Sequence, residues 1–383
     1  MPEIALHIQI HSRETVLRQL NGTAVIATAA AAALLLAGCG SKKSDTTTPA
    51  ASGGSSGTGS SANTASSFKA CMVTDTGGID DKSFNAAAWQ GMQKAQSDGK
   101  ATVSYVQSKQ ETDYATNISS LVSQNCKLIV TVGGLMADAT VAAAKKSASQ
   151  HFVEVDSSGN GTNLQGLQFN TAQAGFLAGY LAAGYSKTGK VATYGGLKIA
   201  PVTVYMDGFQ EGVEYYNKQK SKNVQLLGWD EKKQNGSFAA SFTDQNKGQQ
   251  LATNFVAQGA DVIFPVAGGT GLGSAAYAKS SGKAVVIWVD TDGFVSAPQY
   301  GPVFLSTAEK NIADAVTKSV EDAAAGTFAT TDYVGTLANN GVALAPFHDL
   351  AGKVDSGLKS ELDQVKADIT SGKITITSPS QPK

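Results

Sequence analysis

From residue 68 onward, hydrophobic and polar positions follow a repeating order along the chain. A short apolar run is followed by a turn rich in glycine and aspartate, and then by a longer stretch with apolar residues at helical spacing. Short apolar runs between turn residues are typical of buried strands, and the longer stretches are typical of helices. The predicted strands span residues 69–74, 102–107, 128–132, 151–155, 167–169, 190–194, 224–229, 262–266, 284–289 and 302–305. The predicted helices include 83–97, 114–124, 137–149, 172–185, 201–218, 247–258 and 307–325.

Strands that alternate with helices predict an α/β protein whose parallel sheets are covered by helices on both faces. The predicted strands are too many for one doubly wound domain of ordinary size, so we expect two sheets. In such sheets, ligands bind outside the carboxyl ends of the strands. The candidate functional residues are therefore those that follow the strands.

The first part of the chain does not follow this order. Residues 22–36 carry no charge and are almost entirely apolar, with Arg18 just upstream. This run is shorter than the about 20 residues of a membrane-spanning helix and is typical of a signal peptide. It ends in Leu36-Ala37-Gly38-Cys39, which resembles the bacterial lipobox, in which the cysteine is lipidated. We predict a signal peptide over 1–38 and a lipid on Cys39; the alternative is an ordinary secretory signal in which this cysteine is incidental.

Residues 39–67 are predicted to form a flexible linker behind the lipidated cysteine. Of the 28 residues from Gly40 to Ser67, 24 are Ser, Thr, Gly, Ala or Pro, and such a segment has little to bury. The folded part would then be anchored in the cell membrane and held at its extracytoplasmic face, where disulfides are permitted. Cys71 and Cys126 each lie beside an apolar run, so they either form a disulfide or are buried thiols.

Charge and composition narrow the classes of function. The 383 residues include 30 Lys and Arg against 31 Asp and Glu, a formal net charge of −1. A nucleic-acid-binding protein would normally show a basic patch or stripe, so we expect no nucleic acid partner. The glycine-rich run 268–274 follows a strand, yet it lacks the dinucleotide fingerprint, and there is no Walker A motif in the chain. With four histidines, two of them in the leader, we expect no metal cluster, no Ser/His/Asp triad and no cofactor.

Aspartate and glycine recur directly after the predicted strands. Glycine lets the backbone approach a ligand closely, and carboxylates accept hydrogen bonds from hydroxyl or ring NH groups. The pattern favours a binding protein for a polar, hydroxyl-rich small molecule over an enzyme. The alternative is that these residues only form turns and helix caps.

Residues 73–85, continuing through Trp89 and Gly91, resemble the opening motif of the basic membrane protein (BMP, or PnrA-like) family. Further similar stretches lie at 132–139, 176–180, 195–213, 244–263, 346–349 and 369–374. Members of this family are substrate-binding lipoproteins of ABC importers, and characterised members bind purine nucleosides. The resemblance implies the type I periplasmic-binding-protein fold over 68–379, with two doubly wound lobes, three crossings and a cleft between the lobes. The expected lobes are about 68–176 plus 302–330 and about 177–301 plus 331–379.

The resemblance also implies roles for individual residues. Phe84 would stack on the purine, and Phe242 would cover its other face, with Phe238 and Phe209 as alternatives for the second ring. Family members hold the ribose hydroxyls with an aspartate, a glycine and a lysine, and the matching positions here are Asp290, Gly268 and Lys310. Packing on the core is the alternative role for Phe84, and a solvated position in the first turn of a helix is the alternative for the lysine.

Four further residues are candidates for the cleft. Asp75 would contact the base or the sugar, and Asn85 would support it. Asp138 and Asp156 are expected to line the cleft, where either could read the polar edge of the purine.

These expectations combine into one mechanism. A monomer would close around its ligand and dock on a membrane permease, and ATP would be hydrolysed on separate ATPase subunits. Two other classes of protein fit the same sequence less well. One is a sensor or adhesin lipoprotein without a transport partner, and the other is an outer-face enzyme such as a nucleoside hydrolase.

Overall fold

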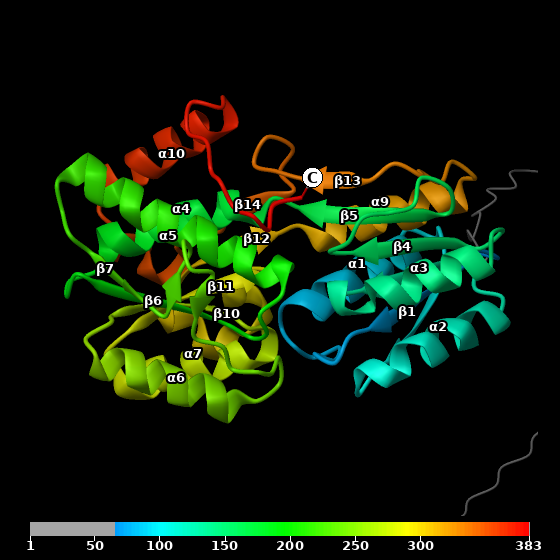
Figure 1. Ribbon diagram of the computed structural model, residues 1–383, viewed down its shortest axis with the longest axis horizontal. Coiled ribbons are helices and arrows are strands. Elements are labelled where there is room, and N and C mark those ends of the chain that lie inside the picture. The colour runs from blue at the N-terminus through cyan, green and yellow to red at the C-terminus, as the bar shows by residue number, and fades with distance from the viewer. Residues whose placement is uncertain (1–65, 383) are drawn as a thin grey trace, which may run out of the picture. The chain divides into compact units, whose positions relative to one another are not determined.

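A computed structural model describes residues 66–382 of the protein. The predicted signal peptide, the predicted lipidation site Cys39 and all of the predicted linker except residues 66 and 67 lie outside the described residues. The described chain contains two six-stranded sheets, which Figure 1 shows with their covering helices. The predicted α/β architecture with two doubly wound lobes is confirmed.

The first lobe is built on a sheet in which all neighbouring strands are parallel. Its strand order is β13-β5-β4-β3-β1-β2. The strands are β1 (Lys69–Thr74), β2 (Thr102–Gln107), β3 (Leu128–Val132), β4 (His151–Val155), β5 (Leu164–Phe169) and β13 (Tyr333–Gly335). The helices are α1 (Phe84–Ser97), α2 (Tyr114–Ser123), α3 (Ala137–Lys146) and α9 (Ile312–Ala324). Alternate residues of β1 face two separate apolar clusters, because successive side chains of a strand point to opposite faces.

The second lobe repeats this plan, with the order β14-β12-β11-β10-β6-β7. Only β14 is antiparallel to its neighbour. The strands are β6 (Lys190–Gly195), β7 (Gln225–Leu227), β10 (Val262–Val266), β11 (Val285–Asp290), β12 (Phe304–Lys310) and β14 (Val342–Leu344). The helices are α4 (Thr171–Tyr185), α5 (Ala200–Lys220), α6 (Gln245–Ala257), α7 (Gly271–Ser281), the single turn α8 (Gly293–Ser296) and α10 (Ser356–Thr370). A two-stranded ribbon, β8 (Trp229–Asp230) and β9 (Asn235–Gly236), lies outside the main sheet.

The chain passes between the lobes three times, as expected, but the lobe boundaries differ from the predicted ones. The crossings follow β5, β12 and β13. The prediction places 302–330 in the first lobe, but β12, which lies in this range, belongs to the second sheet. It places 331–379 in the second lobe, but β13, which lies in that range, belongs to the first sheet. Strand pairing decides their place, since β12 pairs with β11 and β14, and β13 pairs with β5.

The predicted helix over 307–325 begins too early. Residues 304–310 form β12, and the helix α9 starts only at Ile312. The strand is buried even though it contains serine and threonine, because the Ser306 hydroxyl donates to the Ala345 carbonyl (2.7 Å) and the Thr307 hydroxyl accepts from the Gly293 N–H (3.0 Å). Lys310 therefore ends a strand and does not lie in the first turn of a helix.

Cys71 and Cys126 form a disulfide within the first lobe. Cys71 lies on β1, and Cys126 lies two residues before the neighbouring strand β3. Both are buried in the apolar cluster under α2 and α3. Of the two alternatives that the sequence left open, the structure therefore shows the disulfide.

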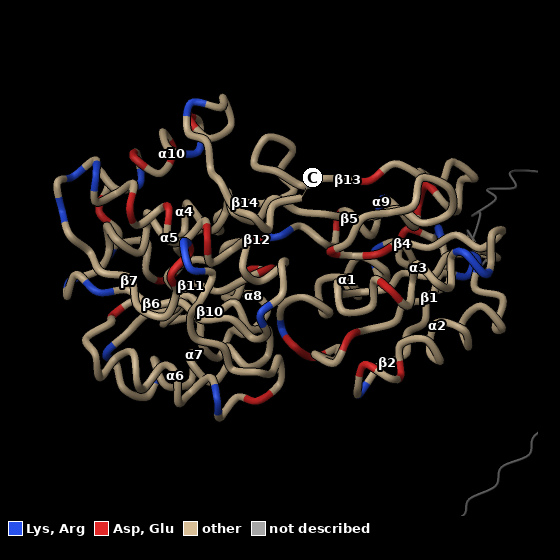
Figure 2. Tube along the Cα trace, viewed as in Figure 1, with Lys and Arg blue, Asp and Glu red and all other residues tan. Residues whose placement is uncertain are grey.

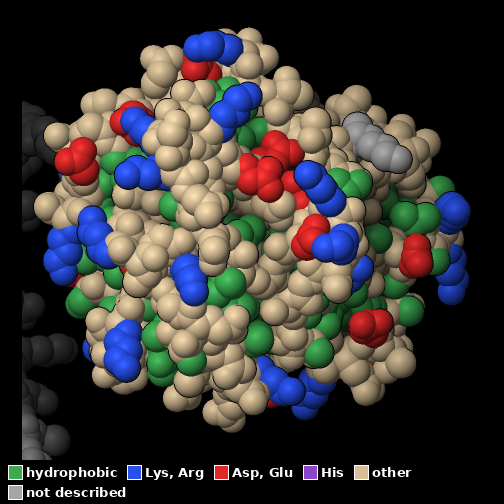
Figure 3. Space-filling model, turned by 60° about the vertical axis from the view of Figure 1, so that its left-hand side comes forward, with side chains coloured by type: hydrophobic (Ala, Val, Ile, Leu, Met, Phe, Trp, Pro, Cys, Tyr) green, Lys and Arg blue, Asp and Glu red, His purple; other side chains and the backbone are tan. Residues whose placement is uncertain are grey.

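Charged residues of both signs are spread over both lobes (Figure 2). In the view of Figure 3, several acidic side chains gather into one group. One acidic cluster of the second lobe consists of Glu231 with Asp207, Glu211 and Glu214 of α5, and burial together with these carboxylates raises the pKa of Glu231 to about 8. The C-terminal segment contacts this cluster, since the Thr377 N–H donates to Glu211 (2.9 Å).

Among the described residues, no helix combines the length and the apolar character needed to cross a membrane.

Candidate functional site

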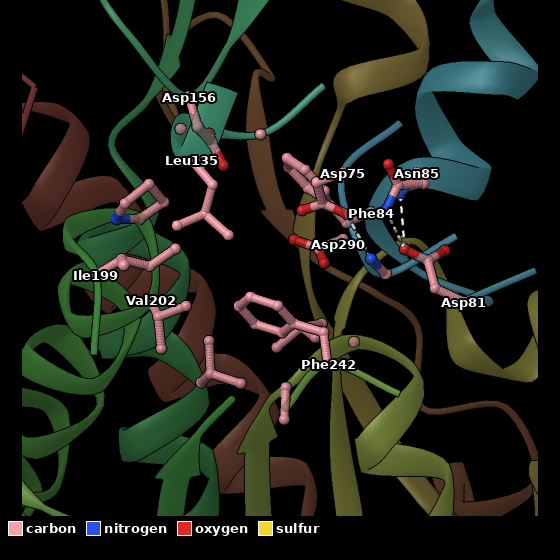
Figure 4. Close-up of a pocket in the computed structure, with 18 of the residues that line it drawn as sticks. Asp75, Asp81, Phe84, Asn85, Leu135, Asp156, Ile199, Val202, Phe242 and Asp290 are labelled. Carbon is pink, nitrogen blue, oxygen red and sulfur yellow. Dashed lines mark hydrogen bonds between the residues drawn. The ribbon is translucent and has the colours of Figure 1, made fainter. Parts of the chain in front are cut away.

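One pocket lies between the carboxyl ends of the two sheets (Figure 4). It encloses about 550 Å³ outside protein atoms, open space at its mouth included. The pocket is lined by Asp75, Gly77, Asp81, Phe84, Asn85, Gly133, Gly134, Leu135, Asp156, Ile199, Pro201, Val202, Tyr205, Phe242, Val266, Ala267, Gly268, Val289, Asp290 and Lys310.

Two of the pocket aspartates occupy equivalent places in the two lobes. Asp156 directly follows β4, and Asp290 ends β11, the strand with the same place in the second sheet. Both have left-handed backbones, with φ of 75° and 68°. Such conformations cost non-glycine residues energy and persist where the surroundings fix them, often at functional sites. The fold thus presents one strained aspartate from each lobe to the pocket.

Asp75 follows β1 and presents a free acceptor to the pocket. Its Oδ1 accepts from the Gly77 N–H and from Asn85 Nδ2, both at 2.8 Å. Its Oδ2 lies so close to Gly133 that a Cβ added to this glycine would be 2.8 Å from the oxygen. Among residues 66–382, no hydrogen-bond donor bonds to Oδ2. Burial raises the pKa of Asp75 to about 6, an effect that these two hydrogen bonds only partly offset.

Two half-buried phenylalanines enter the pocket from different lobes. Phe84 is the first residue of α1, whose start is fixed because Asp81 accepts the N–H groups of Ser83, Asn85 and Ala86 at 2.7–3.0 Å. Phe242 lies in the loop before α6 of the second lobe, and its ring projects into the pocket in Figure 4. The Phe242 carbonyl accepts from the Thr270 N–H (3.0 Å), and each ring offers an apolar face to a ligand.

Lys310 joins the lobes through a buried ion pair. Its Nζ lies 2.5 and 2.6 Å from the two carboxylate oxygens of Asp156, and the side chains are 3% and 8% exposed. The same ammonium lies 4.8 Å from the ring centroid of Phe84 and 5.4 Å from that of Phe169. Burial raises the pKa of Asp156, and the lysine opposes this shift.

Asp290 also makes a contact between the lobes. Its Oδ2 accepts from the Ser83 hydroxyl of the first lobe (2.5 Å), and its Oδ1 accepts from the Tyr205 hydroxyl of α5 (3.1 Å). The wall opposite Asp290 includes the apolar side chains of Leu135, Ile199 and Val202, with Asp156 beside Leu135 (Figure 4). The pocket is thus suited to a ligand with a flat apolar part and a part rich in hydrogen-bonding groups.

The structure brings eight of the nine predicted ligand residues to this pocket, namely Asp75, Phe84, Asn85, Asp156, Phe242, Gly268, Asp290 and Lys310. Asp138 is the exception: it is exposed in the first turn of α3 and does not line the pocket. A short 3-10 helix (Gly134–Met136) between β3 and α3 lines the pocket in its place.

Of the three phenylalanines considered for the second ring, only Phe242 lines the pocket. Phe238 packs edge-on against Trp229, with ring centroids 5.9 Å apart. Phe209 is fully buried and stacks on Phe264, at 4.8 Å.

The sequence prediction missed several pocket residues. Tyr205 and Val202 belong to α5, most of whose first half is buried, so apolar spacing gives no signal for the face that meets a ligand. Asp81 belongs to the motif at 73–85, but nothing in the sequence marks it as a pocket residue. Within the described part of the chain, no three His, Cys, Asp or Glu residues are placed to hold a metal ion.

Residues 68–378 match the Bmp family, described as ABC transporter substrate-binding protein PnrA-like. A relative from Lactococcus lactis, the ABC transporter nucleoside-binding protein BmpA, is 30% identical over 337 residues, which cover 84% of this chain and 92% of that protein. The CD4+ T-cell-stimulating antigen of Listeria innocua is 36% identical over 58% of this chain, and the match spans 61% of its own length. Basic membrane protein A of Borreliella burgdorferi is 29% identical over 60% of this chain and 65% of its own.

Among solved structures, an ABC transporter solute-binding protein from Aeropyrum pernix has the same fold, with a TM-score of 0.71 and 22% identity over 82% of this chain and 94% of that one. A solute-binding protein from Conexibacter woesei has a TM-score of 0.62 at 21% identity, over 81% of this chain and 99% of that one. The family match covers nearly the whole described chain and includes every residue of the pocket. The chain therefore belongs to the PnrA-like family of ABC transporter substrate-binding proteins.

Proposed function

We propose that this protein captures a nucleoside, with a purine base, and delivers it to an ABC importer. The observation that carries the proposal is the pair Phe84 and Phe242, which enter one pocket from two lobes beside buried carboxylates and an ammonium group. The name of the Lactococcus lactis relative as a nucleoside-binding protein supports the same ligand class.

The base would lie between the two phenylalanine rings. Stacking of a base on an aromatic side chain contributes about 1–3 kcal/mol and tolerates different bases. Asp290, Lys310 and Gly268 would hold the ribose, since a carboxylate accepts from a hydroxyl and an ammonium donates to one. Bonds of this charge-assisted kind contribute about 1.5–3 kcal/mol each.

The two-lobe construction supports a role in transport. The lobes would close on the ligand by a hinge motion at the three crossings, as in other periplasmic binding proteins. The loaded protein would then dock on a permease, and ATP would be hydrolysed on separate subunits. In this proposal the protein acts at the extracytoplasmic face, anchored by a lipid on Cys39.

Titration calorimetry tests the ligand class. The purified protein, unfolded and refolded to remove bound ligand, is titrated with adenosine, guanosine, inosine, uridine and ribose. We expect the purine nucleosides to bind, and Phe84→Ala to weaken binding by roughly 5- to 150-fold, the equivalent of one lost stacking contact. Phe238→Leu is the matched control, because this half-buried ring packs outside the pocket. Absence of heat with all five compounds would contradict the proposal.

Binding should depend on the protonation of Asp75. Its pKa is about 6, and a ligand donor at Oδ2 would stabilise the ionised form. Below this pKa the carboxyl binds a proton that the ligand must displace, so the Kd should rise up to about tenfold per pH unit from pH 6 to pH 5. Titrations at pH 5.0, 6.0 and 7.5 measure this slope. The Asp75→Asn variant should bind more weakly, and its Kd should not depend on pH in this range. If the Kd of that variant changes with pH as steeply as that of the wild type, Asp75 is not the titrating group.

The same group sets a pH dependence of stability. An aspartate with a raised native pKa binds a proton more readily in the folded than in the unfolded protein. Its contribution to the free energy of unfolding is therefore largest below pH 4 and falls as the pH rises to about 6. The contributions of Asp75 to ligand binding and to ligand-free stability should thus change in opposite directions with pH.

A further inference from the structure

In the turn before α1, Lys82 and Ser83 touch the second lobe but do not line the pocket. The Lys82 carbonyl accepts two hydrogen bonds from that lobe, one from Trp288 Nε1 of β11 (3.2 Å) and one from the Ser296 hydroxyl of α8 (2.9 Å). The next residue, Ser83, donates to Asp290 (2.5 Å) and to the Val289 carbonyl (3.3 Å). Lys82, Ser83, Trp288 and Ser296 are all absent from the pocket wall.

This turn is held rigidly by its own lobe. Lys82 has a φ of 58°, a left-handed conformation that costs a non-glycine residue energy unless its surroundings fix it. Directly before it, the buried Asp81 carboxylate accepts three backbone N–H groups at the start of α1. The strained carbonyl is therefore presented to the second lobe by a pre-organised loop, and the donors of that lobe complete its hydrogen bonding.

The contacts of Lys82 lie outside the pocket wall, unlike the polar contacts that Lys310 and Asp290 make between the lobes. The ion pair of Lys310 and Asp156 lies in the pocket wall, so a ligand would contact it directly. The acceptor of Ser83, Asp290, also lies in that wall. The Ser296 hydroxyl bonds only to the backbone of the other lobe, so it can be removed without changing any side chain that lines the pocket.

We propose that Lys82 and Ser83 form a latch, a positioning element that holds the two lobes together and sets the affinity for ligand without contacting it. This proposal rests on the proposed ligand-binding function of the pocket. A pocket whose walls come from both lobes is complete only when they meet, so the apparent Kd equals the intrinsic Kd divided by the fraction of closed protein. Loss of a latch bond lowers that fraction.

Ser296→Ala tests the latch by calorimetry and by stopped-flow measurement of dissociation, with a purine nucleoside as probe. Loss of one neutral hydrogen bond should raise the Kd by roughly three- to tenfold. The increase should appear mainly as faster dissociation. Ser296→Thr keeps the hydroxyl and should restore the affinity. Ser280→Ala is the matched control, since that exposed serine bonds only within α7, to the Tyr277 carbonyl.

A second measurement needs no ligand and separates the latch from the proposed function. Spin labels on cysteines that replace Lys109 and Lys247, exposed residues of the first and second lobes, report the distance between the lobes. The full chain carries Cys39→Ser so that only the introduced thiols react. We expect a longer, broader distance distribution for Ser296→Ala and for Trp288→Phe, and an unchanged one for Ser296→Thr.

The outcomes distinguish the possibilities. A merely structural role would lower the melting temperature of Ser296→Ala and leave the distance distribution unchanged, and that result would overturn the latch. An unchanged distance together with an unchanged Kd would also overturn it. If no nucleoside binds but the distance widens, the latch stands and the ligand assignment fails.

Discussion

Replacement of Gly179 by leucine is expected to prevent the protein from folding. Helices α4 and α5 touch backbone to backbone, so that a Cβ on Gly179 would lie 2.0 Å from the Phe209 carbonyl oxygen. Gly212, on the facing helix, is equally close to the Phe176 carbonyl oxygen. Overpacking of a core typically costs about 1–3 kcal/mol, and more where the neighbour is rigid. Here the neighbour is backbone, so we expect at least about 3 kcal/mol for alanine and no soluble folded protein for leucine.

Thermal unfolding followed by circular dichroism measures this effect. Gly179→Ala should unfold at a clearly lower temperature than the wild type. The control is Gly352→Ala, because an added Cβ there meets no atom within 4 Å and the backbone φ is not positive. A Gly179→Leu protein that melts with the wild type would show that the two helices are not packed at this distance.

The arrangement that creates the pocket could be predicted from the sequence because it depends on strand ends. Asp75, Gly268 and Asp290 each follow or end an apolar run, and parallel strands bring their carboxyl ends to one edge of a sheet. The local pattern therefore placed these residues correctly even though it says nothing about the distance between the two sheets.

The errors arose where tertiary structure decides the outcome. The pattern placed Lys310 on a helix because residues 304–310 mix polar and apolar side chains, yet hydrogen bonds to neighbouring segments let this strand be buried. Asp138 looked like a residue at a strand end, but the intervening 3-10 helix carries it out of the pocket. The latch at Lys82 was beyond prediction, because its backbone angle and its partners 206 and 214 residues away leave no trace in the local sequence.

The family resemblance and the local pattern contributed different information. Without the resemblance, Phe84 and Phe242 would be two of 14 phenylalanines with nothing to distinguish them from core residues. The apolar wall of the pocket was found by neither route, since Ile199 and Val202 belong to the start of a helix whose other faces are also largely buried. Such residues become visible only once the lobes are placed together.

Replacement of Lys310 by methionine is expected to destabilise the protein and to weaken binding at least about tenfold, through two separate causes. The Asp156 carboxylate, 8% exposed, would lose its counter-charge while Asp290 remains nearby as a like charge. Removal of one member of a buried ion pair typically costs about 3–5 kcal/mol. Without the lysine the pKa of Asp156 would rise further, so the loss of stability should be largest at high pH and smaller near pH 5, where the carboxyl can take a proton.

The double variant Lys310→Met/Asp156→Asn separates these causes. Asparagine tolerates the left-handed backbone at this position, with its φ of 75°, and leaves no unpaired charge, so much of the lost stability should return. Affinity should not return, because the proposed donor to the ribose is still missing, and we expect the Kd to stay at least about tenfold above wild type. Urea unfolding at pH 5 and pH 8 together with calorimetry measures both effects. If the double variant binds nucleoside like the wild type, Lys310 only neutralises Asp156 and does not contact the ligand.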